Sequence, residues 1–362
     1  MTTATGQHAS RLRRLWSRYR LRWKRREILW RAIRVGRRLT PLADRTAAIR
    51  KDDILLFATI RNEAGRLPEF LAHYRKLGVQ HFLIVDNDSD DGSTALLLEQ
   101  PDLSLWRSRE SYRGARFGMD WIGALLLRYG HGHWCVTVDA DELLIYPDWE
   151  RRTLSGLTRF LDDQQMVGMG ALMLDLYPQQ PLGQAEAPQD APLTERLPWF
   201  DAGPYRCEIS YPKGNRILRG GVRERVFFQD DRDISPTLNK LPLIRWHWRY
   251  AYVNSTHSLL PGYLNELYDG PGDPRPSGVL LHSKFLPEII GKSSEELKRR
   301  QHFSNPDQFV DYHQTLVEEP ILWNSDSQRY TGWKHLVELG LMGTGQASDL
   351  PLETARHSAE TE

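Results

Sequence analysis

Carboxylate side chains gather in three short segments, each at the end of an apolar run. They are Arg61-Asn62-Glu63, the loop from Asp86 to Ser93, and Asp139-Ala140-Asp141-Glu142. Two carboxylates one residue apart can reach the same divalent ion and leave positions for phosphate oxygens. Mg²⁺ and Mn²⁺ prefer such all-oxygen ligation. The third segment therefore predicts a metal site, with Asp139 and Asp141 as ligands.

The loop from Asp86 to Ser93 also invites comparison with a calcium-binding EF-hand, because Asp86, Asp88 and Asp90 offer alternate oxygens. An EF-hand needs glycine at its sixth position and glutamate at its twelfth. These positions hold Asp91 and Leu97, which excludes that kind of site. A solvated turn that caps the next helix stays open as the alternative to a ligand-binding loop.

Alternating strand and helix patterns must position these segments. Helices are predicted from Leu67 and over 117–129, because apolar residues recur there at steps of three and four. The predicted strands of this part are ILLFAT (54–59), HFLIVD (81–86), LSLW (103–106) and CVTVD (135–139). Strands separated by helices indicate an α/β fold with a mostly parallel sheet and helices on both faces. Ligands bind at the carboxyl ends of such strands, which is where the acidic segments lie.

The remaining chain shows further strand patterns and a helical end. The predicted strands there are 169–177, 225–228, 241–246, 251–257 and 278–285. The predicted organisation is a basic helical arm over 1–50, a catalytic domain over 51–290, C-terminal helices over 291–342 and a disordered tail over 343–362. Within the catalytic domain, we expect 51–165 to bind the nucleotide and 166–290 to bind the acceptor.

RNE, IVDNDSDDGS and VDADE, in this order and spacing, resemble the motifs of nucleotide-sugar glycosyltransferases with the GT-A fold. The resemblance is closest to family 2 and to family 92-like bacterial enzymes. It covers about 54–177 well and extends more thinly to about 290. It implies a Rossmann-like GT-A sheet, a Mn²⁺ or Mg²⁺ cofactor and a nucleotide-sugar donor, with a UDP-sugar favoured.

The resemblance also implies roles for individual residues. The donor-binding positions are Thr59, Arg61, Asn62, Glu63, Asp86, Asp88, Asp91, Arg116, Lys240 and Lys284. Asp139 and Asp141 match the metal-binding DxD motif, and His257 and His282 are candidates for a late histidine at the metal or diphosphate. The Glu-Asp pair that often supplies the catalytic base of family 2 has no recognisable counterpart. Glu224, Asp175 and Asp201 are the base candidates, and Glu224 is preferred because two flanking arginines would keep it ionised.

The basic arm carries 15 Lys and Arg residues against two acids within residues 1–50, a net charge of +13. Over 11–38 its apolar residues have helical spacing, and they include Trp16, Tyr19, Trp23 and Trp30. Aromatic rings and arginines on one helix are typical of binding at an anionic membrane surface. A helix that docks on its own protein or self-associates stays open, as does nucleic-acid binding, which is the least expected of the three.

The rest of the composition limits the class of protein. No apolar run reaches the ~18 residues of a membrane span, and two cysteines cannot form a disulfide scaffold. We expect a cytoplasmic enzyme at the inner face of the cell membrane, without a nucleic-acid partner. Its predicted activity is metal-dependent, inverting transfer of a sugar to a glycan or glycolipid, in cell-surface polysaccharide synthesis. The alternatives are a nucleotidyltransferase, which the loop ATIRNEAG disfavours, and an inactive relative that binds glycans or membranes.

Overall fold

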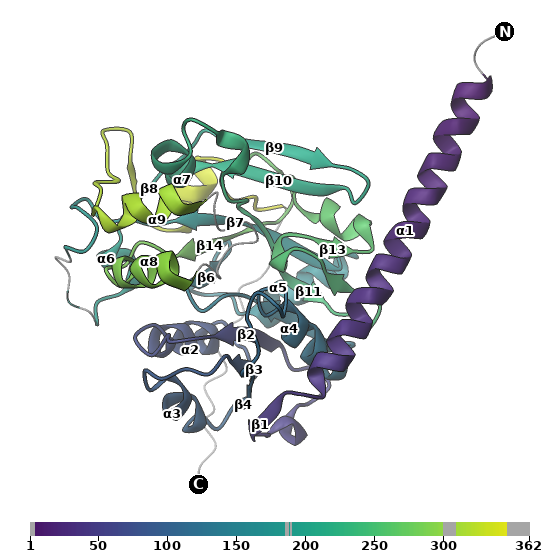
Figure 1. Ribbon diagram of the computed structural model, residues 1–362, viewed down its shortest axis with the longest axis horizontal. Helices are drawn as coiled ribbons and strands as arrows, with labels where there is room; N and C mark the ends of the chain where they lie inside the picture. The colour runs from purple at the N-terminus through teal and green to yellow at the C-terminus, as the bar shows by residue number, and fades with distance from the viewer. Residues whose placement is uncertain (1–3, 185–187, 189, 300–308, 346–362) are drawn as a thin grey trace.

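A nine-stranded mixed sheet forms the centre of the protein (Figure 1). The computed structural model describes residues 4–184, 188, 190–299 and 309–345. In spatial order the strands of the sheet are β1 (Thr40–Ala43), β4 (Leu103–Arg107), β3 (His81–Asp86), β2 (Leu55–Ile60), β5 (Trp134–Thr137), β11 (Asn239–Arg245), β7 (Gly168–Asp175), β14 (Gly278–His282) and β6 (Glu142–Ile145). The run β4-β3-β2-β5 is parallel, and so is the pair β7-β14. The other neighbours are antiparallel. The predicted α/β class is confirmed, but the sheet is mixed.

Alternate residues of β2 feed two apolar cores, because successive side chains of a strand point to opposite faces. Leu56, Ala58 and Ile60 pack with the helices of one face, and Leu55 and Phe57 pack with those of the other. The helices of the first face are α2 (Leu67–Lys76), α3 (Ser93–Leu98) and α5 (Leu154–Asp163), and that of the second is α4 (Met119–Leu125). Helices on both faces of the sheet were predicted, and this is confirmed.

Smaller elements lie outside the central sheet. They are the strand pairs β9 (Tyr205–Ser210) with β10 (Asn215–Gly220), β12 (Ala251–Tyr252) with β13 (Leu259–Leu260) and β8 (Trp199–Phe200) with β15 (Gln328–Arg329), and the helices α6 (Leu193–Arg196), α7 (Gly221–Phe227), α8 (Glu288–Arg299), α9 (Val310–Val317) and α10 (Trp333–Glu338). The predicted strand at 225–228 is wrong, because Arg225 to Phe227 lie in α7. The predicted tail over 343–362 lies outside the described residues from 346 onward.

The basic arm forms one long helix, α1 (Ala4–Gly36), which runs along the side of the body and projects beyond it (Figure 1). Its second half is part of the fold, since Ile28 and Ala32 are buried. A Cβ atom at Gly36 would lie 2.7 Å from the Cβ of Ala124, so the close crossing of α1 over α4 depends on that glycine. β1 follows directly and pairs with β4. The second half of α1 and β1 therefore pack with the body, although both lie within the predicted arm of 1–50.

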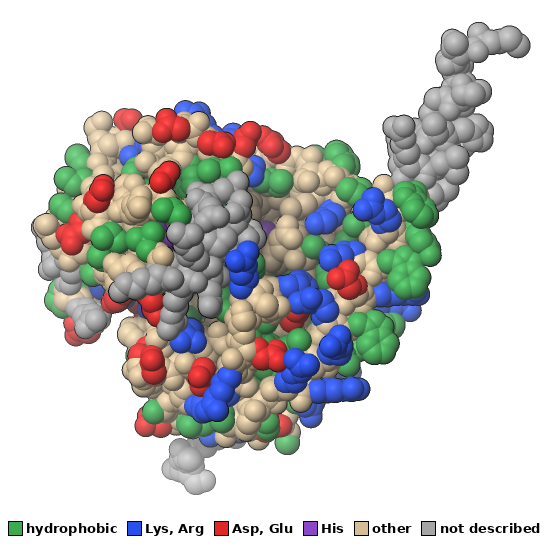
Figure 2. All heavy atoms as spheres, in the orientation of Figure 1, with side chains coloured by type: hydrophobic (Ala, Val, Ile, Leu, Met, Phe, Trp, Pro, Cys, Tyr) green, Lys and Arg blue, Asp and Glu red, His purple; other side chains and the backbone are tan. Residues whose placement is uncertain are grey.

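None of the described helices has the length and apolar content that a bilayer crossing requires. Along the coloured part of α1 in Figure 2, the side chains are a mixture of Lys or Arg and hydrophobic groups.

Candidate functional site

The three acidic segments meet at one edge of the sheet. β3, β2 and β5 are parallel neighbours, so their carboxyl ends lie side by side. The segments that follow them are 61–66, 86–93 and 139–142. The sequence predicted this arrangement, and it places the three groups of polar side chains where α/β sheets bind ligands.

The loop after β3 is organised by its own carboxylates. Asp86 is fully buried, and its Oδ1 accepts hydrogen bonds from the backbone N–H and the hydroxyl of Ser89, at 3.0 and 2.6 Å. Its Oδ2 accepts from the hydroxyl of Thr94. Asp91 accepts in the same way from the N–H of Ser93, at 2.9 Å. Asp88 is exposed and pairs with Arg109 at 3.3 Å. Asp86 and Asp91 therefore hold the loop shape, and Asp86 presents no free carboxylate oxygen to a ligand.

The loop after β2 is tied to the loop after β3. Arg61 donates to the carbonyl of Asn87 at 2.8 Å, and the N–H of Asn62 donates to the hydroxyl of Ser89 at 3.0 Å. Thr59 lies beneath Gly118, where an added Cβ would be 2.8 Å from the Thr59 Oγ1. The two loops thus form one rigid platform.

Glu63, the last residue of the RNE motif, is enclosed by two cations. Its Oε2 pairs with Arg66 at 2.7 Å and its Oε1 pairs with Lys292 of α8 at 2.6 Å. Neither cation is among the residues predicted from the sequence. The predicted donor contact of Glu63 would therefore have to compete with this double ion pair.

Asp139, Asp141 and Glu142 form the acidic centre of the site. Each offers one carboxylate oxygen, and these oxygens lie within 4.8 Å of one another. The side chains of Asp139 and Asp141 are 49% and 24% exposed, whereas that of Glu142 is 1% exposed. Asp139 and Asp141 therefore face the solvent, with Glu142 behind them.

Lys240 supplies a buried positive charge to this centre. Its Nζ lies 2.9 Å from the Asp139 Oδ2 and 2.9 Å from the Glu142 Oε1. Burial opposes the charged ammonium, but the two carboxylates outweigh it and raise the pKa of Lys240. Burial raises the pKa of Glu142 to about 7, against the opposing effect of Lys240. Lys240 reaches this place because β11 runs antiparallel next to β5.

His282 links the acidic centre to a buried ion pair. Its Nε2 lies 3.1 Å from the Asp141 Oδ2, and its Nδ1 lies 2.6 Å from the Asp175 Oδ1. The second oxygen of Asp175 pairs with Arg223 at 2.7 Å. Ionised carboxylates only accept hydrogen bonds, so this arrangement suits the imidazolium form, in which both ring nitrogens donate. Burial opposes this charge, but Asp141 and Asp175 outweigh it and raise the pKa of His282.

His282 also changes the pKa of Asp141. Burial disfavours its ionised form, but the facing His282 outweighs burial and holds the pKa of Asp141 well below its usual range. His282 can contact Asp175 because the register of β14 against β7 places these two residues opposite each other. Asp141 is therefore an ionised, accessible carboxylate held in place from behind.

The structure separates the two predicted histidines. His282 contacts the acidic centre, whereas the Nδ1 of His257 donates to the carbonyl of Asn239 at 2.6 Å. Burial, followed by the charge of Lys240, lowers the pKa of His257 to about 3. His257 is thus a neutral ring fixed to the backbone of β11, next to the lysine that serves the site.

The three predicted bases also differ in whether they are connected to the acidic centre. Asp175 belongs to the hydrogen-bonded chain behind Asp141. Glu224 is buried and binds Arg206 at 3.2 Å and the hydroxyl of Ser235 at 3.0 Å. Asp201 binds Arg225 through both of its oxygens, at 2.8 and 3.0 Å. Of the three, only Asp175 is connected by hydrogen bonds to the acidic centre.

Arg116 has a structural role. It pairs with the buried Asp120 at 3.2 Å and donates to the carbonyls of Tyr252 and Val253. Arg31 of α1 pairs with the same aspartate at 2.8 Å. The guanidinium therefore helps to join α4, β12 and α1, and a diphosphate would have to share it with these partners.

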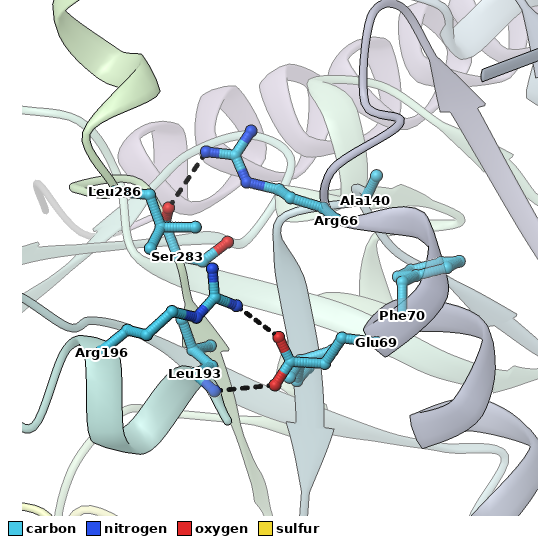
Figure 3. Close-up of a pocket in the computed structure, with 9 residues that line it drawn as sticks. Arg66, Glu69, Phe70, Ala140, Leu193, Arg196, Ser283 and Leu286 are labelled. Carbon is cyan, nitrogen blue, oxygen red and sulfur yellow. Dashed lines mark hydrogen bonds and ion pairs between the residues drawn. The ribbon is translucent and has the colours of Figure 1, made fainter. Parts of the chain in front are cut away.

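A small pocket opens beside Ala140, between the two aspartates of the DxD motif (Figure 3). Two arginines lie on its wall. Arg66 donates to the carbonyl of Ser283 at 3.3 Å, and Arg196 pairs with Glu69 at 2.6 Å. Arg66 follows the RNE motif by three residues, and this closeness to the motif could have indicated it as a site residue. Arg196 is 130 residues away along the chain, and no local pattern indicates it.

Asp139 and Asp141 fit a hard divalent ion. Both are carboxylates, both are accessible, and together they form the kind of oxygen donor set that Mg²⁺ or Mn²⁺ takes. Glu142 lies within reach of the same ion, but it is buried and paired with Lys240.

No model of a known protein family matches this chain, and no curated protein matches it in sequence.

Proposed function

We propose that the chain transfers a sugar, with inversion, from a nucleotide-sugar donor to a hydroxyl of a glycan or glycolipid, as in cell-surface polysaccharide synthesis. One observation carries the proposal. Two accessible carboxylates, Asp139 and Asp141, follow the parallel strand β5 beside the loops that follow β2 and β3. This is the place and the chemistry that a nucleoside diphosphate with Mg²⁺ or Mn²⁺ requires.

The residues of the chain would divide the work as follows. Asp139 and Asp141 would hold the ion, which neutralises charge on the departing nucleoside diphosphate. His282 keeps Asp141 ionised, and Lys240 lies behind Asp139. Lys284 forms no ion pair with any residue in the described parts of the chain, and burial lowers its pKa. Its half-buried ammonium is our candidate for a donor phosphate.

A base must accept the proton of the attacking hydroxyl. Asp175 is the candidate that the hydrogen-bond network favours, because it reaches the acidic centre through His282. All three carboxylates are paired with an arginine, and Glu224 and Asp201 lack this link to the acidic centre.

A second candidate function is a relative without activity that binds glycans or nucleotides. The internal pairing of Glu63 and Asp86 favours it, because these motif carboxylates are satisfied within the protein. An active transferase would turn over its donor, whereas the inactive relative would only bind its ligand.

The test is a panel of UDP-, GDP- and CMP-sugars, each assayed with and without Mn²⁺ for thermal stabilisation and for hydrolysis. A ligand at 100 times its Kd stabilises a protein by about 2.7 kcal/mol. We expect a UDP-sugar to raise the melting temperature and to be hydrolysed, in both cases with Mn²⁺. Asp141→Asn should abolish both effects, whereas Asp163→Asn, an exposed aspartate of α5, should change neither. Stabilisation without hydrolysis would favour a second candidate that binds nucleotides, and no response to any donor would overturn the transferase proposal.

A further inference from the structure

α1 has two apolar faces on opposite sides of the helix. Successive residues of an α-helix are 100° apart, which places Leu21, Ile28, Ala32 and Gly36 on one side. Trp16, Tyr19, Trp23 and Trp30 fall on the other side. Packing against one body can explain only one of these two apolar faces.

The first face is used by the protein itself. Ile28 packs in a buried cluster with Val253 and Leu260, and Leu21 lies at the edge of that cluster. On the flank of the same face, Arg31 pairs with the buried Asp120 at 2.8 Å. These contacts fix the rotation of the helix about its axis, and therefore the direction of the opposite face.

The second face is exposed to solvent. Trp16, Tyr19, Trp23 and Trp30 are 62%, 50%, 52% and 66% exposed. The rings of Trp16, Tyr19 and Trp23 form a row, with centroids 5.8 Å apart for Trp16 and Tyr19 and 6.1 Å apart for Tyr19 and Trp23. Trp30 lies about two turns further along the same side of the helix. Single exposed hydrophobic residues are ordinary, but a contiguous row of large rings marks an interaction surface.

Basic side chains accompany this row. Arg20, Arg22, Lys24, Arg26 and Arg34 are all exposed on the same segment, and the guanidinium of Arg26 lies 5.2 Å from the centre of the Trp23 ring. Indole and phenol rings favour the headgroup level of a bilayer, where one end is apolar and the other is hydrated. Arginines beside them would meet lipid phosphates.

We propose that the face of α1 formed by Trp16, Tyr19, Trp23 and Trp30 binds an anionic lipid bilayer, with the helix lying in the plane of the headgroups. Because the opposite face is fixed to α4 and β12, binding would orient the whole body on the membrane. A second copy of the chain fits this face less well, since the surrounding arginines of two copies would repel each other. The proposal does not depend on the transferase activity.

The test uses the full chain with vesicles of phosphatidylcholine, alone or mixed with phosphatidylserine. We expect sedimentation with the anionic vesicles, and quenching of tryptophan fluorescence by lipids brominated near the headgroup. Trp16→Ser/Trp23→Ser/Trp30→Ser should reduce binding roughly tenfold or more, while high salt should weaken binding of the natural chain only in part. Val317→Ser/Ile321→Ser, which changes exposed apolar residues outside α1, is the control and should bind normally.

Several outcomes would overturn the proposal. One is a full chain that ignores both kinds of vesicle, and another is a triple variant that binds as well as the natural chain. A dimer that the triple variant abolishes, without vesicle binding, would assign the face to self-association. Binding of an oligonucleotide in place of vesicles would assign it to nucleic acid. Quenching in the natural chain needs no variant, so the test stands even if the triple variant is unstable.

Discussion

The positive charge of Lys240 compensates the buried carboxylate of the acidic centre. A carboxylate as deeply buried as Glu142 costs several kcal/mol to ionise unless a cation lies beside it. The ammonium of Lys240, at 2.9 Å, is that cation, and it also contacts Asp139. Asp139 is half exposed, so water can solvate it if the lysine is removed. The two carboxylates should therefore respond differently to the loss of their shared partner.

Lys240→Met is expected to lower the free energy of unfolding by about 3 to 5 kcal/mol, the usual cost of leaving one partner of a buried pair unmatched. Lys240→Met/Glu142→Gln should recover a large part of this loss, because the second change removes the buried charge. Urea unfolding of the two variants and of Glu142→Gln alone measures the coupling. Equal losses in the single and double variants would show that the lysine acts through packing.

At the residue scale, local motifs and long-range contacts differed in how well they could be predicted. Asp139 and Asp141 could be placed because both follow one apolar run, and the strand that they follow is formed by neighbouring residues. The predicted donor role of Lys240 did not anticipate its pairing with Glu142, 98 residues away along the chain. Such contacts depend on β11 lying beside β5, and no periodicity in either segment specifies which strand is its neighbour.

At the element scale, β6 is an edge strand whose outer backbone groups are covered by α2. The hydroxyl of Tyr74 donates to the carbonyl of Glu142 at 2.9 Å and accepts from the N–H of Leu144 at 3.1 Å. His73 donates from Nε2 to the carbonyl of Leu144 at 2.8 Å. Unpaired edge groups invite association with other chains, so α2 protects the strand that begins in the DxD segment.

His73 makes this attachment sensitive to acid. Burial lowers its pKa to about 4, from the ordinary value of 6.5. Above pH 6.5 the ring is neutral in both the folded and the unfolded chain. Between about pH 6.5 and 4 only the unfolded chain takes up the proton, so stability falls as the pH falls, by about 3 kcal/mol in all.

His73→Gln should make the stability of the chain less dependent on pH across this range. Glutamine keeps an N–H that can donate to Leu144 but binds no proton. The free energy of urea unfolding, measured at about pH 7.5, 6 and 4.5, should fall less steeply in the variant than in the natural chain. Parallel pH profiles would mean that other groups carry the acid sensitivity.

The sequence predicted the inner strands of the central sheet well and missed its two edge strands, β1 and β6. HFLIVD matches β3 residue for residue, and the predicted strands 54–59 and 135–139 overlap β2 and β5. β1 was missed because Thr40–Ala43 is short and contains Pro41, which is tolerated on an edge strand. The segment 225–228 was taken for a strand because an apolar run of that length has no period that separates strand from helix.

At the scale of the whole molecule, α1 joins the two proposed activities physically. Asp120 of α4 is buried and pairs with Arg31 of α1 and with Arg116 of the loop that precedes α4. The outward face of α1, which we propose binds lipid, is thus connected through one aspartate to the sheet that carries the candidate site. An acceptor held in the same membrane would meet the body in a restricted set of orientations.

Two truncations separate the projecting part of α1 from the part that belongs to the fold. Removal of 1–20 keeps Leu21, Ile28 and Ala32, which pack on the body, and should change the free energy of unfolding by less than about 1 kcal/mol. Removal of 1–45 also deletes β1, uncovers β4 and exposes the partners of Ile28 and Ala32. It should cost more than about 4 kcal/mol or prevent folding. Urea unfolding followed by circular dichroism measures both, and a stable, soluble chain without 1–45 would show that α1 and β1 are additions to a body that folds by itself.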